Sequence, residues 1–171
     1  FSASEWINSA AEEEISTVLY KYGDEKASRK IAKAIVRFRE SDRLESTQQL
    51  VQVIETVLKR VGRTHPATKT FQAIRIHVNN ELNHLEMALS KISNILKING
   101  MIVIISFQSL EDRIVKNFFK PEIYSLPKDI PLNNTIEEKF KCLKKKVKPS
   151  AEEVARNPRS RSAVMRVFTK L

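Results

Sequence analysis

A change of pattern at Asn99-Gly100 constrains the fold of this chain more than any other feature. Over residues 66 to about 97, apolar residues recur at steps of three and four, which is the spacing of one helix face. The turn leads into the β-branched run 101–105, which is typical of a strand buried on both faces. A further helix is expected directly afterwards, from Ser109 to about Phe119. A strand that passes straight into a helix, after a long helix, predicts an α/β fold with a doubly wound sheet.

Helices alone are expected before residue 98. Ser9 and Glu12 have the spacing of a capping box, in which each side chain binds a free backbone N–H at the start of a helix. The segment 66–97 is predicted to be one long helix or two helices joined near Asn79-Asn80. The earlier helices that we expect are 9–22 capped by Ser9, 24–40 capped by Asp24, and a helix that Thr47 caps and Gly62 ends.

Strands and an irregular segment are expected near the carboxyl end. Residues 120–136 contain three prolines and no clear period, which predicts a surface loop. The segments 140–145 and 163–169 then predict an antiparallel pair of strands, with a helical turn capped by Ser150 between them. In the helix that follows residue 105, Ser109 and Asp112 are expected to form a capping box.

The positive charge is concentrated in one part of the chain. The net charge is +10, and residues 139–171 hold 11 Lys and Arg against 2 Asp and Glu. A soluble basic segment of this kind commonly binds nucleic acid, although a merely hydrated lysine-rich segment has the same composition. Lys26, Lys30, Lys33 and Arg37 also line up on one face of the second expected helix, facing either solvent or phosphate.

The composition argues against several kinds of site. The three glycines, Gly23, Gly62 and Gly100, each follow a helix, so none belongs to a glycine-rich turn for a nucleotide-type cofactor. The group His77, Glu81 and His84 shares a helix face, but without an HExxH pattern we favour a hydrated flank over a metal site.

The cellular setting is also constrained. A single cysteine, Cys142, excludes an internal disulfide and fits a reducing cytoplasm. No apolar run is long enough to cross a bilayer, and no signal peptide precedes the first helix. We therefore expect a cytoplasmic protein without a membrane partner. Because Phe1 leads at once into helical sequence, we also expect the chain to begin within a longer protein.

Five blocks of sequence, in order, resemble the RsmH (MraW) family of bacterial methyltransferases. The resemblance implies the rear part of a class I, Rossmann-like methyltransferase sheet with an inserted all-helical domain. Residues 1–98 would be mostly the insertion, and residues 99–171 would supply the last strands and helices with a basic tail. The blocks are Ser4–Ser9, Tyr22–Glu25 with Ile31–Val36, His65–Arg75, Ser106–Lys116 and Asn157–Ser162.

The resemblance also implies a function. Members of the family use S-adenosylmethionine to methylate the N4 amine of a cytosine in 16S rRNA of the small ribosomal subunit. The family's cofactor-binding residues precede the matched blocks, so no cofactor-binding residue carries over. No catalytic residue is assigned, and the isolated chain is expected to be inactive. Gln108 stands where the family has a histidine and cannot titrate near neutral pH.

The candidate contacts are polar residues of the matched blocks. For RNA or substrate we select Gln72, Arg75, Gln108, Arg159 and Arg161. Two arginines and two hydroxyls in the turn 157–162 suit a phosphate group, and an ordinary polar turn is the alternative. The alternative function is a non-catalytic, basic RNA-binding or scaffold protein. The oligomeric state is not predicted.

Overall fold

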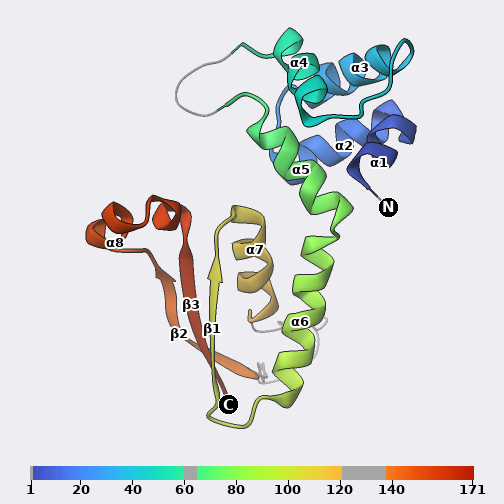
Figure 1. Cartoon of the computed structure of the whole chain (residues 1–171). Coiled ribbons are helices and arrows are strands. Elements are labelled where there is room, and N and C mark those ends of the chain that lie inside the picture. Colours follow the sequence, from blue (N-terminus) through green and yellow to red (C-terminus); the bar gives the residue numbers. More distant parts are fainter. Residues whose placement is uncertain (1, 60–64, 121–137) are drawn as a thin grey trace, which may run out of the picture. The chain divides into compact units, whose positions relative to one another are not determined.

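The computed structural model describes residues 2–59, 65–120 and 138–171 (Figure 1). The chain forms two compact units, Phe1–Glu81 and Leu82–Leu171, which are described separately. The first unit is helical, and the second combines helices with a three-stranded antiparallel sheet. The predicted mixture of helices and strands is therefore confirmed. The units divide at Glu81, whereas the sequence places a division at residue 98.

The first unit is built from amphipathic helices around one apolar core. Trp6, Ile15, Leu19, Ile35 and Ile54 lie in this core with almost no exposed surface. Their spacing along each helix puts them on one face, so burial of that face stabilises the helices. The helices of this unit are α1 (Ala3–Ser9), α2 (Glu12–Gly23), α3 (Ser28–Arg39), α4 (Thr47–Val57) and α5 (Thr68–Val78).

The predicted helix starts are wrong in detail. Ser9 ends α1, and its hydroxyl donates to the carbonyl of Glu5, while α2 has no side-chain cap. Asp24 has φ 49°, so it terminates α2 in the left-handed region instead of capping α3. Ser46 caps α4 in place of Thr47. Each error comes from a competing local hydrogen bond or turn that the spacing of residue types does not reveal. The predicted stop at Gly62 lies outside the described residues.

Two of the matched blocks have a structural explanation. The side-chain amide of Asn8 donates to the carbonyl of Leu44 at 3.0 Å and accepts from the Leu44 N–H at 3.0 Å, which fixes α1 to the segment before α4. At Gly23 a β-carbon would lie 2.6 Å from the carbonyl oxygen of Lys69, so only glycine permits this approach of α2 and α5. These contacts make both blocks part of the first unit's packing.

The long apolar segment forms two helices. α5 ends at Val78, and α6 runs from Glu81 to Ile95. Between them Asn80 has φ 51°, a conformation that asparagine tolerates better than most residues. The second of the two predicted alternatives is therefore confirmed.

The sheet of the second unit has the order β1-β3-β2, and each neighbouring pair is antiparallel. Its strands are β1 (Met101–Ser106), β2 (Phe140–Val147) and β3 (Val164–Lys170). The predicted antiparallel pair of terminal strands is confirmed, and so is the strand that follows Gly100. The connecting elements are α7 (Ser109–Phe118), α8 (Ala151–Arg156), which Ser150 caps, and the 3-10 helix η1 (Pro158–Ser162). The predicted loop at 120–136 falls almost entirely outside the described residues.

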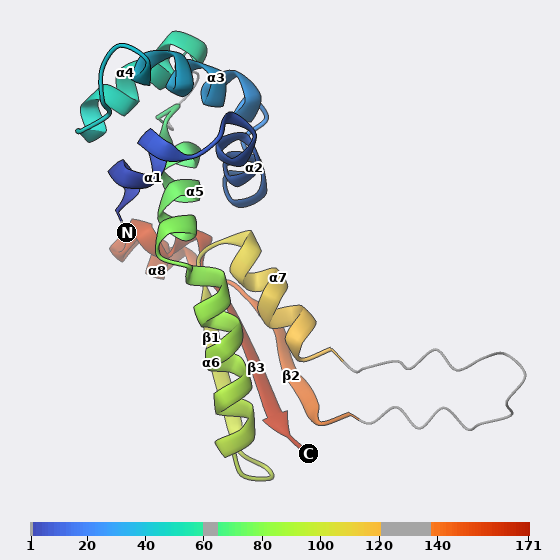
Figure 2. The same cartoon turned by 90° about the vertical axis from the view of Figure 1, so that its right-hand side faces the viewer.

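Elements that the structure describes cover one face of this sheet. Ile102 and Phe168 pack against Leu89 of α6 and Val115 of α7. The helices α6 and α7 lie side by side on that face (Figure 2). On the other face Met101, Val103 and Ile105 are 66%, 57% and 56% exposed. The expectation that β1 is buried on both faces is therefore wrong for this chain, because no described element covers its second face.

Candidate functional site

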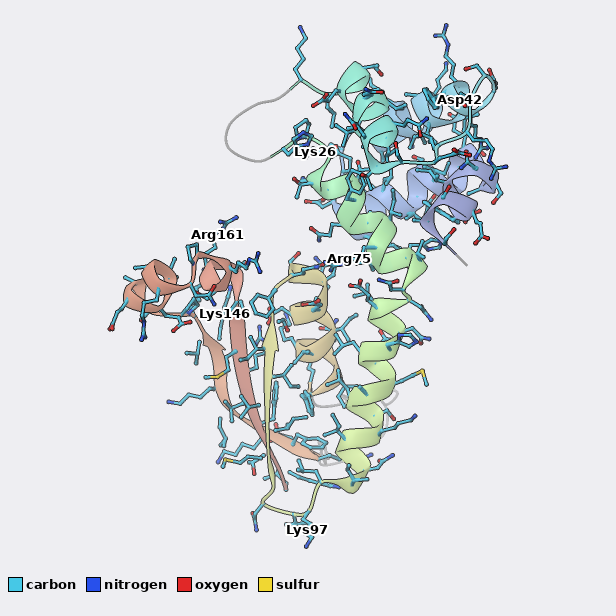
Figure 3. The ribbon with its side chains drawn as sticks, in the orientation of Figure 1. Lys26, Asp42, Arg75, Lys97, Lys146 and Arg161 are labelled. Carbon is cyan, nitrogen blue, oxygen red and sulfur yellow. The ribbon has the colours of Figure 1, made fainter. Side chains whose placement is uncertain are left out.

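One end of the sheet brings two matched blocks together. In the β1–β3 register, Ser106 pairs with Val164, so the carboxyl end of β1 lies beside the amino end of β3. Gln108 follows β1 after one residue, and η1 precedes β3 with one residue between them. Val147, at the end of β2, pairs with Met165 at the same end. The blocks 106–116 and 157–162 therefore meet at this edge of the sheet, where Figure 3 labels Arg161 of the second block.

The corner between β1 and α7 is held by a glutamate. The Glu111 carboxylate accepts the backbone N–H groups of Phe107, at 2.9 Å, and Gln108, at 3.2 Å. Gln108 is half-buried at the start of the helix, and Phe107 is exposed. The predicted Ser109–Asp112 capping box is wrong, because Glu111 binds the N–H groups at this corner and Asp112 is engaged with β3. Hydrogen bonds between neighbouring residues of the chain therefore hold the corner in place.

A buried ion pair fastens this corner to the sheet. Arg166 of β3 donates from Nε and Nη2 to the two carboxylate oxygens of Asp112 at 2.7 and 2.9 Å. It also donates from Nη1 to the backbone carbonyl of Lys145 in β2. The Arg166 and Asp112 side chains are 10% and 20% exposed. Because one guanidinium group binds both α7 and β2, it fixes the start of α7 relative to two strands.

The ion pair shifts both ionisation equilibria toward the charged forms. The hydrogen bonds from Arg166 lower the pKa of the Asp112 carboxyl below its usual value, although burial opposes this effect. The same pair raises the pKa of Arg166. Sequence reasoning missed this pair. The available signal was an arginine among apolar residues of a predicted strand, at a position that alternation assigns to the covered face.

The two arginines of η1 are presented to solvent. Asn157 accepts the N–H of Arg159 at 3.2 Å, and the buried Ser160 donates its hydroxyl to the Asn157 carbonyl at 2.8 Å. Arg159 and Arg161, on either side of Ser160, are exposed. Neither guanidinium forms an ion pair with a residue that the structure describes. The turn therefore holds two cationic groups available to an anionic ligand.

Gln72 and Arg75 belong to the first unit and are described apart from the sheet edge. Arg75 donates from Nε and Nη2 to the carboxylate of Glu81, at 2.8 and 3.0 Å, and remains exposed. It lines a mostly apolar cavity of about 510 Å³ with Ile7, Leu50 and Ile74 (Arg75 is labelled in Figure 3). Gln72, on the same helix, is half-buried. Of the five candidate residues, the structure brings Gln108 and the two η1 arginines to one edge.

His77 lies on α5, whereas Glu81 and His84 lie on α6, so these three residues do not share one helix face as predicted. The ring of His77 lies 4.7 Å from that of Trp6, between centroids, and its Nε2 lies 3.9 Å from a carboxylate oxygen of Glu14. Glu81 binds Arg75. Across residues 2–59, 65–120 and 138–171, no three His, Cys, Asp or Glu side chains are grouped so that they could hold a metal ion.

Comparison with known proteins decides the family. The model of the MraW methylase family matches residues 1–171. The chain belongs to this family. The predicted resemblance is therefore confirmed, over the whole chain.

Relatives of this MraW-family chain share the name Ribosomal RNA small subunit methyltransferase H. The protein from Rickettsia typhi is 45% identical, over 100% of this chain and 58% of its own length. Those from Coprothermobacter proteolyticus and Marinomonas sp. are 46% and 44% identical, over 99% of this chain and 53% and 56% of theirs. The chain thus spans little more than half the length of these relatives. None of its described helices combines the length and apolarity that crossing a membrane requires.

Proposed function

We propose that this chain is the rear part of an enzyme that methylates the N4 amine of a cytosine in 16S rRNA, with S-adenosylmethionine as methyl donor. The observation that carries the proposal is the match of the whole chain to relatives named as small-subunit rRNA methyltransferases. The partner is then the small ribosomal subunit, and the site of action is the cytoplasm. The N4 position and the cofactor come from the family resemblance.

The sheet edge supplies groups that suit this reaction. An enzyme that modifies a base takes the base out of its stack, which requires contacts to the RNA backbone and to the base edge. Arg159 and Arg161 present guanidinium groups that suit phosphate oxygens. Gln108 carries both a hydrogen-bond donor and an acceptor, as the edge of cytosine does, but it cannot take up a proton at neutral pH. We therefore assign Gln108 to base orientation and the two arginines to backbone binding.

The residues present do not fit the cofactor. The backbone N–H groups of Phe107 and Gln108, at the start of α7, are already bound by Glu111. No glycine-rich turn follows β1. S-adenosylmethionine would supply the methyl group from a site in the part of the enzyme that the relatives have and this chain does not span. No step through the cofactor is assigned to this chain.

Gln72 and Arg75 remain candidates for RNA contact. Two donor nitrogens of Arg75 are used by Glu81, and Nη1 has no hydrogen bond to a described residue. Arg75 would therefore contact RNA through this one nitrogen while Glu81 fixes its side chain. Residues 1–98 would be mostly the inserted helical domain, and 99–171 would be the end of the catalytic domain.

We further propose that β1 continues into a larger, Rossmann-like sheet. Within the described residues β1 pairs only with β3, and its apolar second face is exposed. An exposed apolar edge strand invites aggregation, so natural proteins usually cover one. The part of the enzyme upstream of the matched segment would provide further strands beside β1 and the cover for this face.

A chimeric enzyme tests the proposed function. The upstream part of the Rickettsia typhi relative is joined to Phe1 of this chain, and labelled S-adenosylmethionine is supplied with small ribosomal subunits. We expect label in 16S rRNA as N4-methylcytidine, identified by mass spectrometry of the nucleosides. Gln108→Ala should lower kcat/KM by about tenfold, because leaving a desolvated base edge without its hydrogen-bond partner costs about 1–3 kcal/mol. A folded chimera that binds S-adenosylmethionine but transfers no methyl group would contradict the proposal.

The second candidate is a non-catalytic RNA-binding or scaffold protein. Gln108 in place of the family's histidine favours it, because the glutamine side chain at this position does not titrate near neutral pH. In the chimera, this candidate predicts binding to the small subunit without methyl transfer. Gln108→His separates the two cases, since recovery of transfer by this substitution alone would identify Gln108 as the cause of inactivity.

A further inference from the structure

A basic hollow lies on the helical unit, apart from the candidate residues. It has a volume of about 520 Å³ and is formed between α3 and α4. Three cationic residues, Lys30, Lys33 and Arg37, line it, and no acidic residue does. The remaining lining consists of apolar and hydroxyl side chains: Ala34, Phe38, Ser41, Val53 and Thr56.

The hydroxyl groups of this basic hollow are already occupied as donors. Ser41 donates to the carbonyl of Phe38 at 3.0 Å, and Thr56 donates to that of Val53 at 2.7 Å. Lys30, Lys33 and Arg37 form no ion pair or side-chain hydrogen bond with a residue in the described part of the chain. The unsatisfied donors of the hollow are therefore all cationic, and the ligand that satisfies them is an anion.

A neighbouring arginine shows that the charge of α3 is divided between two roles. Arg39 donates from Nη1 to the carbonyl of Ile7 at 2.9 Å, so its guanidinium serves packing within the unit. α3 contains five Lys and Arg and no Asp or Glu. The three residues of the basic hollow lack such a structural partner within the described residues. Repulsion between their like charges also destabilises the helix that carries them.

The spacing of these three residues suits a nucleic acid backbone. Lys30 and Arg37 are seven residues apart, which is about 10 Å along a helix. One strand of a nucleic acid duplex carries a phosphate roughly every 3.4 Å of axis, so about three phosphates fall within this length. Phe38 and Val53 add an apolar floor on which a sugar or base can rest.

We propose that the basic hollow of Lys30, Lys33 and Arg37 binds the RNA backbone, as a contact separate from the sheet edge. The inference rests on the proposed function for the identity of the nucleic acid. It assigns the hollow to sequence-independent phosphate binding, which adds affinity for the ribosomal RNA without selecting the target base.

Binding of the 171-residue chain to a fluorescein-labelled single-stranded oligoribonucleotide tests this inference by anisotropy at several salt concentrations. The variant Lys30→Gln/Lys33→Gln/Arg37→Gln should bind at least about tenfold more weakly at low salt. The slope of log affinity against log salt should fall by about 2, since each lost phosphate contact removes about 0.7. The loss should be uniform across RNA sequences. Because all three side chains are exposed and their like charges repel one another, the melting temperature should not fall.

A matched variant removes the same charge elsewhere. Lys21→Gln/Lys91→Gln/Lys97→Gln alters three exposed lysines that do not line the hollow, and its affinity should stay within about twofold of wild type. Lys30→Arg/Lys33→Arg should retain binding. Equal loss in the two glutamine variants, or no loss in either, would overturn the inference. So would a chain that binds phosphatidylserine vesicles through this hollow in preference to the oligoribonucleotide.

The chimera separates this inference from the proposed function. Introducing the three glutamine substitutions of the hollow into the chimera tests the inference at limiting RNA. If the rate of methyl transfer does not change, the inference about the basic hollow is overturned and the proposed function is unaffected. If the chimera transfers no methyl group, but RNA binding by the chain still depends on the hollow, the proposed function is contradicted and the inference about the hollow is unaffected.

Discussion

The two units of this chain differ in how completely they bury their apolar residues. In the helical unit, Ile15, Leu19 and Ile35 have no exposed surface, and the core extends through all five helices. In the sheet unit, one face packs on α6 and α7, while Val103 and Ile105 on the other face stay more than half exposed. The helical unit therefore buries its apolar residues among its own described helices. In the sheet unit, the exposed apolar face is the one that the proposed larger sheet would cover.

The largest effect is expected in the helical core. Ile35→Ala removes a fully buried side chain and should lower the free energy of unfolding of this unit by about 4 kcal/mol. Trp6 is the chain's only tryptophan and lies in this core, so its fluorescence during urea unfolding reports on this unit. Val103→Ala is the control and should change this transition by less than about 0.5 kcal/mol. Comparable shifts for the two variants would break the distinction between the units.

The next effect concerns the ion pair of the sheet unit. Asp112→Asn leaves Arg166 buried without its counter-charge and should cost about 2–3 kcal/mol, below the value for fully buried pairs because both side chains keep some exposure. Amide hydrogen exchange of β3 and α7 measures the loss. Asp112→Leu combined with Arg166→Met should cost less than Asp112→Asn, since no unpaired charge remains. If the double variant is less stable than Asp112→Asn, the ion pair contributes more to the stability of the sheet unit than its geometry implies.

The ion pair also predicts a pH dependence confined to the sheet unit. The pKa of Asp112 is lowered by Arg166, so the unfolded chain takes up a proton at a higher pH than the folded chain. The contribution is therefore present above the ordinary carboxyl pKa of about 4 and is lost as the pH falls through the lower, folded value. The protection factors of the β3 amides, which are corrected for the intrinsic pH dependence of exchange, should fall on acidification in the wild type and change less in Asp112→Asn. If the wild type and Asp112→Asn respond identically to acid, the ion pair is not the cause of the pH dependence.

The same contrast explains which features the sequence predicts. Helices and strands follow from periodicity and composition, and most were found near the expected residues, although the helix starts differ. The break at Asn79-Asn80 was one of the two predicted alternatives. Whether a strand's second face is covered depends on residues far away, so the run 101–105 predicted a strand but not its exposure. Arg166 and Asp112 are separated by 54 residues, and only the sheet register brings them together.

The candidate site, like the fold, could be predicted only in part from the sequence. The matched blocks led to Gln108, Arg159 and Arg161, and the antiparallel register explains why these residues share an edge. Helix capping was predicted poorly, because Ser9 and Asp112 each have a competing partner. The basic row on α3 was visible as a helical stripe. The hollow that its residues line required the packing of α4 against it.

The exposed sheet face provides the smallest expected effect in the isolated chain and the most direct test of the central claim, that this chain is part of a larger enzyme. Val103→Lys/Ile105→Lys places two charges on a face that is open in this chain, so the free energy of unfolding of the sheet unit should fall by about 1 kcal/mol or less. In the chimera with the upstream part of the Rickettsia typhi relative, the same face is expected to be buried. The unfolding free energy should then fall by more than about 4 kcal/mol, with loss of methyl transfer. Equal, small losses in both proteins, with methyl transfer intact, would contradict the account.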